Sequence, residues 1–178
     1  TQPLKKTMKL EAGLKSSYVT TDNDVKYVNY YAGEAVIDTG KTNHFNYKEN
    51  INAAYINWKA EYKKIGLELG LRGEQTIADG KQVVNNETFS RNYFQLFPST
   101  FFNYKFTDKH MTQISYSRRI DRPAYQQLNP FRYYLDPYTY QQGNPNLEPQ
   151  ITDNYEATYI FKQLYSIKFN YSHTSQAM

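Results

Sequence analysis

The sequence has no cysteine among its 178 residues. It can therefore contain neither a disulfide framework nor a thiolate metal site, which are the usual supports of small secreted domains. It also has no run of about 18 apolar residues, the length that a membrane-spanning helix requires. The first ten residues contain no apolar core of a signal peptide, so we expect that a leader has been removed or that the chain is an internal piece.

Motifs of catalysis and of metal or nucleotide binding are missing as well. The three histidines, His44, His110 and His173, do not have metal-ligand spacing. There is no nucleophile elbow and no glycine-rich phosphate loop. The 21 Lys and Arg residues are dispersed among 17 Asp and Glu, for a net charge of +4. We therefore expect no bound metal, no cofactor, no nucleic-acid partner and no enzymatic activity.

What the sequence does contain is an unusual number of aromatic residues for so polar a chain. Mean hydropathy is -0.82, yet 19 Tyr and 10 Phe bring the aromatic share to 17%. Disordered chains are poor in aromatic residues. A polar average with abundant Tyr is typical of strands that show one face to lipid and the other to water, with aromatic girdles at both membrane interfaces.

Apolar and polar residues alternate with a period of two, which places successive side chains on opposite faces of a strand. In the clearest case, Leu67, Leu69 and Leu71 are separated by Glu68 and Gly70. The segments with this alternation are 8–14, 65–71, 155–161 and 165–171. Two less regular strands are expected over 93–106 and 111–120. Segment 44–60 has competing apolar faces, which predicts a bulge near Ala53.

The connections between these segments alternate in length. Short links are expected at 62–64, 107–110 and 162–164, and long links at 20–43, 78–91 and 121–150. Residues 25–31 could form a hairpin within the first long link. Outer-membrane barrels have short periplasmic turns and longer extracellular loops. The pattern predicts an all-β, antiparallel up-and-down meander of about seven to eight strands, with 121–150 as a long extracellular loop.

Bacterial single-chain barrels have an even number of strands, so a count near seven indicates an incomplete barrel. The last residues, 172–178, stop in mid-pattern, and the first strand begins close to residue 5. We therefore expect residues 1–178 to be part of an outer-membrane β-barrel that is truncated at both ends.

The segment after residue 115 contains an ordered set of proline and glycine motifs. Proline removes a donor from a strand ladder and constrains the residue before it, so Pro123 and Pro130 should end strand pairing and shape a rigid loop. Gly and Asn followed by Pro are typical of a turn. The residues of this motif set are Arg122, Pro123, Asn129, Pro130, Phe131, Gly143, Asn144, Pro145, Leu147 and Pro149.

These motifs resemble the barrel of TonB-dependent receptors, specifically the outer membrane protein beta-barrel family. Residues 70–74 are similar to the family's Gly-Leu-Arg-x-Glu strand, and residues 96–99 to its Phe-Pro strand entry. Gln150 departs from the family's usual Glu. The matches extend from about residue 50 to 160.

The resemblance implies a large barrel with a plugged lumen, in the bacterial outer membrane. It implies that the whole protein imports a scarce nutrient, of siderophore, glycan, cobalamin or peptide type. The implied partners are outer-membrane lipid, the unknown nutrient, and the TonB system through regions absent from this chain. A surface lipoprotein is an additional candidate partner.

The Tyr-rich part of the long loop is the best candidate for ligand contact, because Tyr offers a large contact area with a polar tip. The candidate residues are Arg132, Tyr133, Tyr134, Tyr138, Tyr140 and Gln141. The alternative is that these aromatics belong to the interfacial girdle. The motif set is expected to stabilise the loop on its strands, with direct ligand contact as its alternative. Arg118, Arg122, Glu148 and Glu156 could pair across strands facing the lumen.

Two rival architectures remain open from the sequence. One is a soluble, secreted β-sandwich that binds glycans through Tyr-rich loops, and the other is a small independent eight-stranded outer-membrane barrel. The barrel hypotheses require the alternating Leu, Ile, Tyr and Phe side chains to face hydrocarbon. The sandwich requires the same side chains to lie in a dry interior between two sheets.

Overall fold

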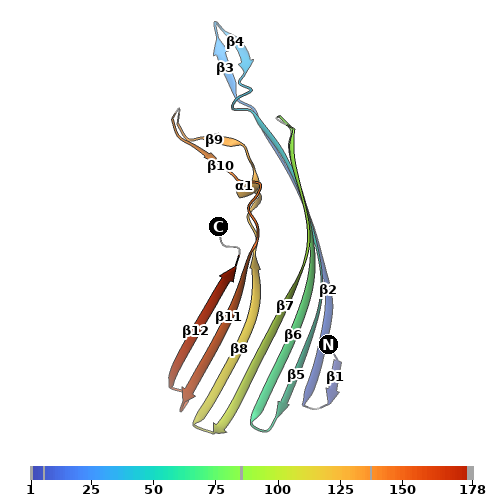
Figure 1. Ribbon diagram of the computed structural model, residues 1–178, viewed down its shortest axis with the longest axis vertical. Helices are drawn as coiled ribbons and strands as arrows, with labels where there is room; N and C mark the ends of the chain where they lie inside the picture. Colours follow the sequence, from blue (N-terminus) through green and yellow to red (C-terminus); the bar gives the residue numbers. More distant parts are fainter. Residues whose placement is uncertain (1, 6, 85, 137, 176–178) are drawn as a thin grey trace.

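The protein is dominated by one curved antiparallel sheet whose strands follow each other in chain order. A computed structural model describes residues 2–5, 7–84, 86–136 and 138–175 (Figure 1). The sheet consists of β1 (Gln2–Lys5), β2 (Met8–Val25), β5 (Asn43–Tyr62), β6 (Ile65–Gln82), β7 (Glu87–Thr107), β8 (His110–Asp121), β11 (Gln150–Phe161) and β12 (Tyr165–Ser175), in this order. The prediction of a meander of seven to eight strands is confirmed.

The sheet has one apolar face, because residues paired directly across neighbouring strands lie on the same side. Trp58, Leu69 and Thr100 form one such row, and Ile56 pairs with Leu71 in the next. Several side chains on this side are exposed: Leu69 is 42% exposed, and Phe169 on β12 is 69% exposed. We call this side of the sheet the apolar face. A continuous exposed apolar surface of this extent requires an apolar environment.

The opposite side, which we call the polar face, contains the charged and amide side chains that alternate with the apolar ones. Glu68, Ser115 and Glu156 lie on it, as does Asn57. The rival β-sandwich is therefore wrong for this chain. The described residues form one large sheet and two small hairpins, and the alternating apolar side chains do not face a second sheet.

Connections of different length lie at opposite ends of the sheet. The short turns at 63–64, 108–109 and 162–164 all lie at the bottom of Figure 1, which we call the turn end. The long connections lie at the top, which we call the loop end, together with the short connection between β6 and β7. The predicted separation of short turns from long loops is therefore present for these three turns and for loop 121–150.

The predicted long link at 78–91 is wrong, and the one at 20–43 is shorter than predicted. Residues 78–91 do not form a loop: β6 continues to Gln82, β7 begins at Glu87, and Ala78 pairs with Arg91. In the same way β2 continues to Val25, where it pairs with Asn43. The strands thus extend far beyond the apolar region. At their tips, the side of the sheet that continues the apolar face carries polar residues.

The predicted hairpin near residues 25–31 is present at the loop end, as β3 (Val28–Tyr31) and β4 (Glu34–Ile37). The predicted bulge near Ala53 is wrong, because β5 pairs with β2 and β6 without a shift of register. Ala53 and Tyr55 lie on the polar face, where Tyr55 packs over Gly13. Because apolar residues such as these lie on the polar face, segment 44–60 showed two competing apolar faces in the sequence.

Loop 121–150 turns back over the polar face at the loop end (Figure 1). It contains α1 (Tyr125–Leu128), β9 (Arg132–Tyr134) and β10 (Tyr140–Gln142). Leu128 of α1 is buried against Phe45, Tyr47 and Ala78 of the sheet. The small hydrophobic core of the protein therefore lies between this loop and the strands. In the part of the chain that the structure describes, no helix has the length and apolar character needed to cross a membrane.

Candidate ligand-binding site

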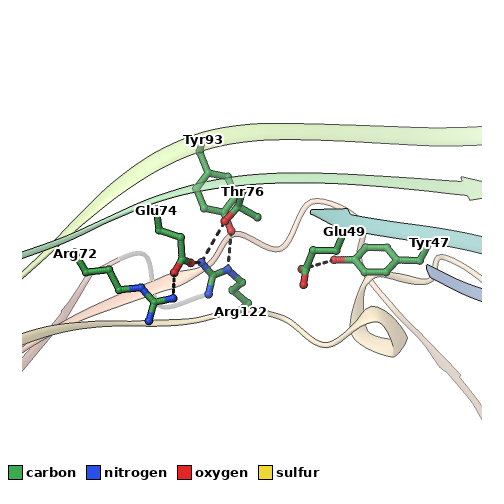
Figure 2. A network of polar contacts seen from close by, with 7 residues as sticks. All are labelled: Tyr47, Glu49, Arg72, Glu74, Thr76, Tyr93 and Arg122. Carbon is green, nitrogen blue, oxygen red and sulfur yellow. Dashed lines mark hydrogen bonds and ion pairs between the residues drawn. The ribbon is translucent and has the colours of Figure 1, made fainter. Parts of the chain in front are cut away.

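The loop is attached to the sheet by an ion-pair network around Glu74, a carboxylate on β6 that is only 2% exposed. Arg122 and Arg72 both form ion pairs with this carboxylate (Figure 2). The Arg122 guanidinium also donates to the hydroxyl oxygens of Thr76 and Tyr93, each at 3.2 Å. A buried carboxylate needs such partners, because removing it from water without compensation is costly.

The position of Arg122 follows from the local sequence. Strand β8 ends at Asp121, and Pro123 cannot donate to a ladder, so the backbone leaves the sheet directly after Arg122. The side chain is thereby free to reach across to β6 and β7. Of the four residues expected to pair facing the lumen, Arg122 does so on the polar face, and Glu156 pairs there with Lys168 at 2.7 Å. Glu148 lies in the loop, near Arg122 beside a hollow of about 140 Å³.

Arg118 does not join them, which corrects the expectation that it faces the lumen. Its guanidinium binds Asp153 in a bidentate pair, at 2.8 and 3.0 Å, on the apolar face. Tyr116 donates to the same carboxylate at 2.7 Å. This pair lies at the loop-end border of the apolar region, where a charge on the lipid side costs little. A charged side chain therefore does not by itself show that a residue lies on the polar face.

A second attachment joins the two ends of the loop. The Gly143 amide donates to the Asn129 carbonyl at 2.9 Å, and the Asn144 amide donates to the Gln127 carbonyl at 2.6 Å. A Cβ at Gly143 would collide with three backbone carbonyl oxygens of residues 126–129. Arg91 of β7 donates to the carbonyl of Pro145. Glycine at this position permits the close approach that closes the loop.

Tyr47 and Phe89 form the floor on which the loop rests, together with Phe45. The Phe89 ring lies over Gly80, where a Cβ would overlap it, and its centroid is 6.4 Å from those of Phe45 and Tyr47. Tyr47 donates to Glu49 at 2.9 Å (Figure 2). Burial, and then this hydrogen bond to a carboxylate, raise the pKa of Tyr47. The Tyr47 phenol therefore stays neutral, and its hydrogen bond to Glu49 fixes the ring beside Phe89.

A cavity of about 630 Å³ lies between the loop and the loop-end tips of β2 and β5. Amide side chains provide more than half of its lining residues, aromatic residues provide three, and none of the lining residues is charged. It is lined by Asn23, Val25, Asn43, Tyr125, Gln126, Gln127, Asn129, Phe131, Tyr133, Gln141, Gln142, Gly143, Asn144 and Leu147. Its volume is within the range of about 300–1,000 Å³ that is usual for small-molecule sites.

The structure separates the six residues expected to contact a ligand. Tyr133 and Gln141, which pair across β9 and β10, line the cavity. Arg132 lies 4.8 Å from the centroid of the Tyr140 ring, which also packs 5.8 Å from Tyr134. Tyr138 is 96% exposed and lies away from the cavity lining. The tyrosines do not form one surface, and those outside the cavity pack on each other or face solvent.

The motif set lies where a structural role would place it. Arg122, Gly143, Asn144 and Pro145 form the attachments described above, and Leu147 packs against the core. Asn129, Phe131, Gly143, Asn144 and Leu147 line the cavity as well. The two roles expected for the motif, loop support and ligand contact, therefore coincide in space.

The sequence did not identify the amides outside the loop, Asn23 on β2 and Asn43 on β5, as site residues. They are far from the loop in the sequence, and only the return of the loop over the polar face brings them to the cavity. A larger hollow of about 840 Å³ lies elsewhere, among Leu14, Ile56 and Leu96. It lies on the apolar face, so its chemistry suits lipid chains.

Within the described ranges, no three His, Cys, Asp or Glu residues are grouped so that they could hold a metal ion. Comparison with known protein families shows that the model of the Outer membrane protein beta-barrel family matches residues 1–178. No curated protein matches the chain.

Proposed function

The chain belongs to the outer membrane protein beta-barrel family, and we propose that it is the barrel segment of a TonB-dependent receptor that imports a scarce nutrient. As a family member it resides in the bacterial outer membrane, with the apolar face in contact with lipid. Loop 121–150 would be the extracellular element that first contacts the nutrient. The turn end would then face the periplasm, as short turns do in outer-membrane barrels.

The observation that carries this proposal is the direction in which the loop folds. Arg122 bound to buried Glu74, and Leu128 packed among the strands, hold the loop over the polar face rather than outside the sheet. In a barrel the polar face is the inner wall. A loop fixed above the lumen, with an uncharged cavity beneath it, is suited to catch a solute at the entrance of a transport path.

The sheet itself supports a wide barrel. In the part of the chain that the structure describes, β1 and β12 do not pair with each other, so these strands do not form a closed eight-stranded barrel. Closure therefore needs further strands, and a barrel with more strands encloses a larger lumen. This favours a transporter over the small independent barrel.

We also propose that the chain is not an enzyme. Two carboxylates of the polar face are bound to cations: Glu74 to two arginines, and Glu156 to Lys168. A carboxylate whose oxygens are engaged by a neighbouring cation is less available to contact a substrate. A TonB partner and a surface lipoprotein belong to the same transport proposal, through parts of the protein outside this chain.

The transport proposal can be tested by growth. A strain lacking the intact protein is compared with its parent on limiting ferric chelates, cobalamin, oligopeptides or oligosaccharides. We expect a growth defect on one of these nutrient classes, and the same defect in a strain that lacks functional TonB. Normal growth of the deletion strain on all of them would count against import. A defect that does not depend on TonB would point to passive diffusion.

A further inference from the structure

The cavity under the loop has a lining that is specific in its chemistry. Eight of its fourteen lining residues are Asn or Gln, and none is Asp, Glu, Lys, Arg or His. The chain as a whole is 21% charged, so an uncharged lining of this size is distinctive. A carboxamide offers both donors and acceptors without net charge. The cavity thus suits a ligand that is rich in hydrogen-bonding groups and has no charge.

Several of these amides are held in place by the loop backbone. Asn129 accepts from the Phe131 amide at 3.1 Å, and Asn144 accepts from the Asn146 amide at 2.9 Å. Gln142 donates to the Pro130 carbonyl at 2.7 Å. In each case the loop uses one end of the amide, and the other end has no hydrogen bond to the residues that the structure describes. Side chains that are already oriented lose less entropy on binding.

Apolar rings are interleaved with the amides. Tyr125, Phe131 and Tyr133 line the cavity beside Gln126 and Gln141. An aromatic ring has an electron-rich face, which attracts the electropositive edge of a neighbouring group. The C–H face of a sugar ring is such a group, and its hydroxyls form a rim that both donates and accepts. Alternating aromatic and amide side chains match those two features together.

We infer that the cavity binds a neutral carbohydrate, and that the imported nutrient is an uncharged oligosaccharide. This inference rests on the transport proposal for its second half only. An anionic ferric chelate requires cationic partners, which the lining does not offer. Of the arginines near the cavity, Arg122 is paired with Glu74, and Arg132 lies over the ring of Tyr140. A peptide brings charged termini, for which the lining has no counter-ion.

The test is calorimetric titration of the intact protein in detergent. The probes are neutral hexasaccharides of glucose, xylose and mannose in their common linkages, with an oligogalacturonate and a ferric hydroxamate chelate as charged comparisons. We expect binding of at least one neutral hexasaccharide and none of the charged probes. Tyr133→Ala should raise its Kd about tenfold, through loss of one stacked ring. Gln141→Ala should raise it about threefold to tenfold.

The matched control is Tyr138→Ala, which removes a tyrosine of the same loop outside the cavity and should leave Kd unchanged. Binding of a charged probe alone, of no hexasaccharide, or equal loss in Tyr138→Ala and Tyr133→Ala would each overturn the carbohydrate site. Transport is judged separately by growth on the same hexasaccharide. Binding without TonB-dependent growth would refute import and leave the carbohydrate site standing. TonB-dependent growth on another nutrient class, without sugar binding, would refute the carbohydrate site and leave import standing.

Discussion

Glu74 shows how one residue determines the position of a thirty-residue loop. Its carboxylate is 2% exposed and has two arginine partners, of which only Arg122 belongs to the loop. Arg122→Ala would leave the buried carboxylate with Arg72 alone. Breaking a buried ion pair typically costs about 3–5 kcal/mol, and because one partner remains we expect a loss near 3 kcal/mol.

Urea unfolding of the intact protein in lipid vesicles would measure this loss. The control is Arg119→Ala. Arg119 follows Arg118 on β8, its side chain is exposed, and it forms no ion pair among the described residues. Adding Glu74→Gln to Arg122→Ala should restore part of the stability, because a neutral amide tolerates burial better than a lone carboxylate. Equal stability of Arg122→Ala and the wild type would show that the network does not hold the loop.

Gly143 is the second residue whose substitution separates the loop from the sheet. A Cβ there meets the carbonyl oxygens of residues 126, 127 and 129, which belong to the backbone and cannot swing away. We expect Gly143→Ala to destabilise the closed loop by about 1–3 kcal/mol, as overpacking does in a core. Trypsin should then cleave after Arg132 faster than in the wild type. Gly40→Ala is the control, since its only neighbour there is a side-chain oxygen at 3.4 Å. Unchanged cleavage would contradict the role assigned to Gly143.

At the scale of a strand, the two faces of β6 should tolerate charge differently. Leu69→Arg places a cation on the apolar face, where it costs about 2–4 kcal/mol near the bilayer midplane. Glu68→Arg places the same side chain on the polar face one residue away. We expect Leu69→Arg to reduce the amount of folded protein in the outer membrane, measured by the heat-modifiable shift in gel mobility, and Glu68→Arg to leave it unchanged. Equal effects would refute the assignment of faces.

The tips of β6 and β7 lead to another prediction. Residues 78–82 of β6 pair with β5 on one side and with β7 on the other, so their amides should exchange slowly with deuterium, as amides in ladders do. The exposed turn at residues 32–33, between β3 and β4, provides a fast-exchanging reference. Exchange of residues 78–82 as fast as in that turn would support the loop that the sequence indicates at 78–91.

These tips also show which parts of the fold can be read from the sequence. Alternation identified the strands near Leu69 and Phe169 because one face meets lipid and the other water. Beyond the apolar region the outward side of β6 carries Asp79 and Lys81, while Ala78 on the other side is covered by the loop, so the apolar alternation that lipid imposes is lost although the ladder continues. Pairing there depends on the neighbouring strands, which a local pattern does not report.

The site was predictable in part for a related reason. The proline and glycine motifs marked the loop, and Tyr133 and Gln141 were expected to contact a ligand. The pairing of Arg122 with Glu74 and the contribution of Asn23 join segments that are distant in the sequence, so no local spacing could show them. Arg118 was placed on the wrong face because a border position permits a charge toward lipid.

At the scale of the whole molecule, the arrangement of turns and loops predicts its orientation in the membrane. The chain has no cysteine, so single cysteines can report the exposure of each end without removal of native thiols. Tyr138→Cys lies in the loop and replaces a side chain that is 96% exposed. Asp108→Cys lies in the short turn between β7 and β8, at the opposite end of the sheet (Figure 1).

A maleimide too large to pass the outer membrane, added to intact cells that produce the full-length protein, should label Tyr138→Cys and not Asp108→Cys. Both should react after the membrane is permeabilised, which controls for reactivity of the thiols. Outer-membrane barrels have short periplasmic turns and longer extracellular loops, so we expect the end with loop 121–150 to face the outside of the cell. The reverse labelling pattern would place the cavity in the periplasm, and the loop could then not be the first contact of an imported solute.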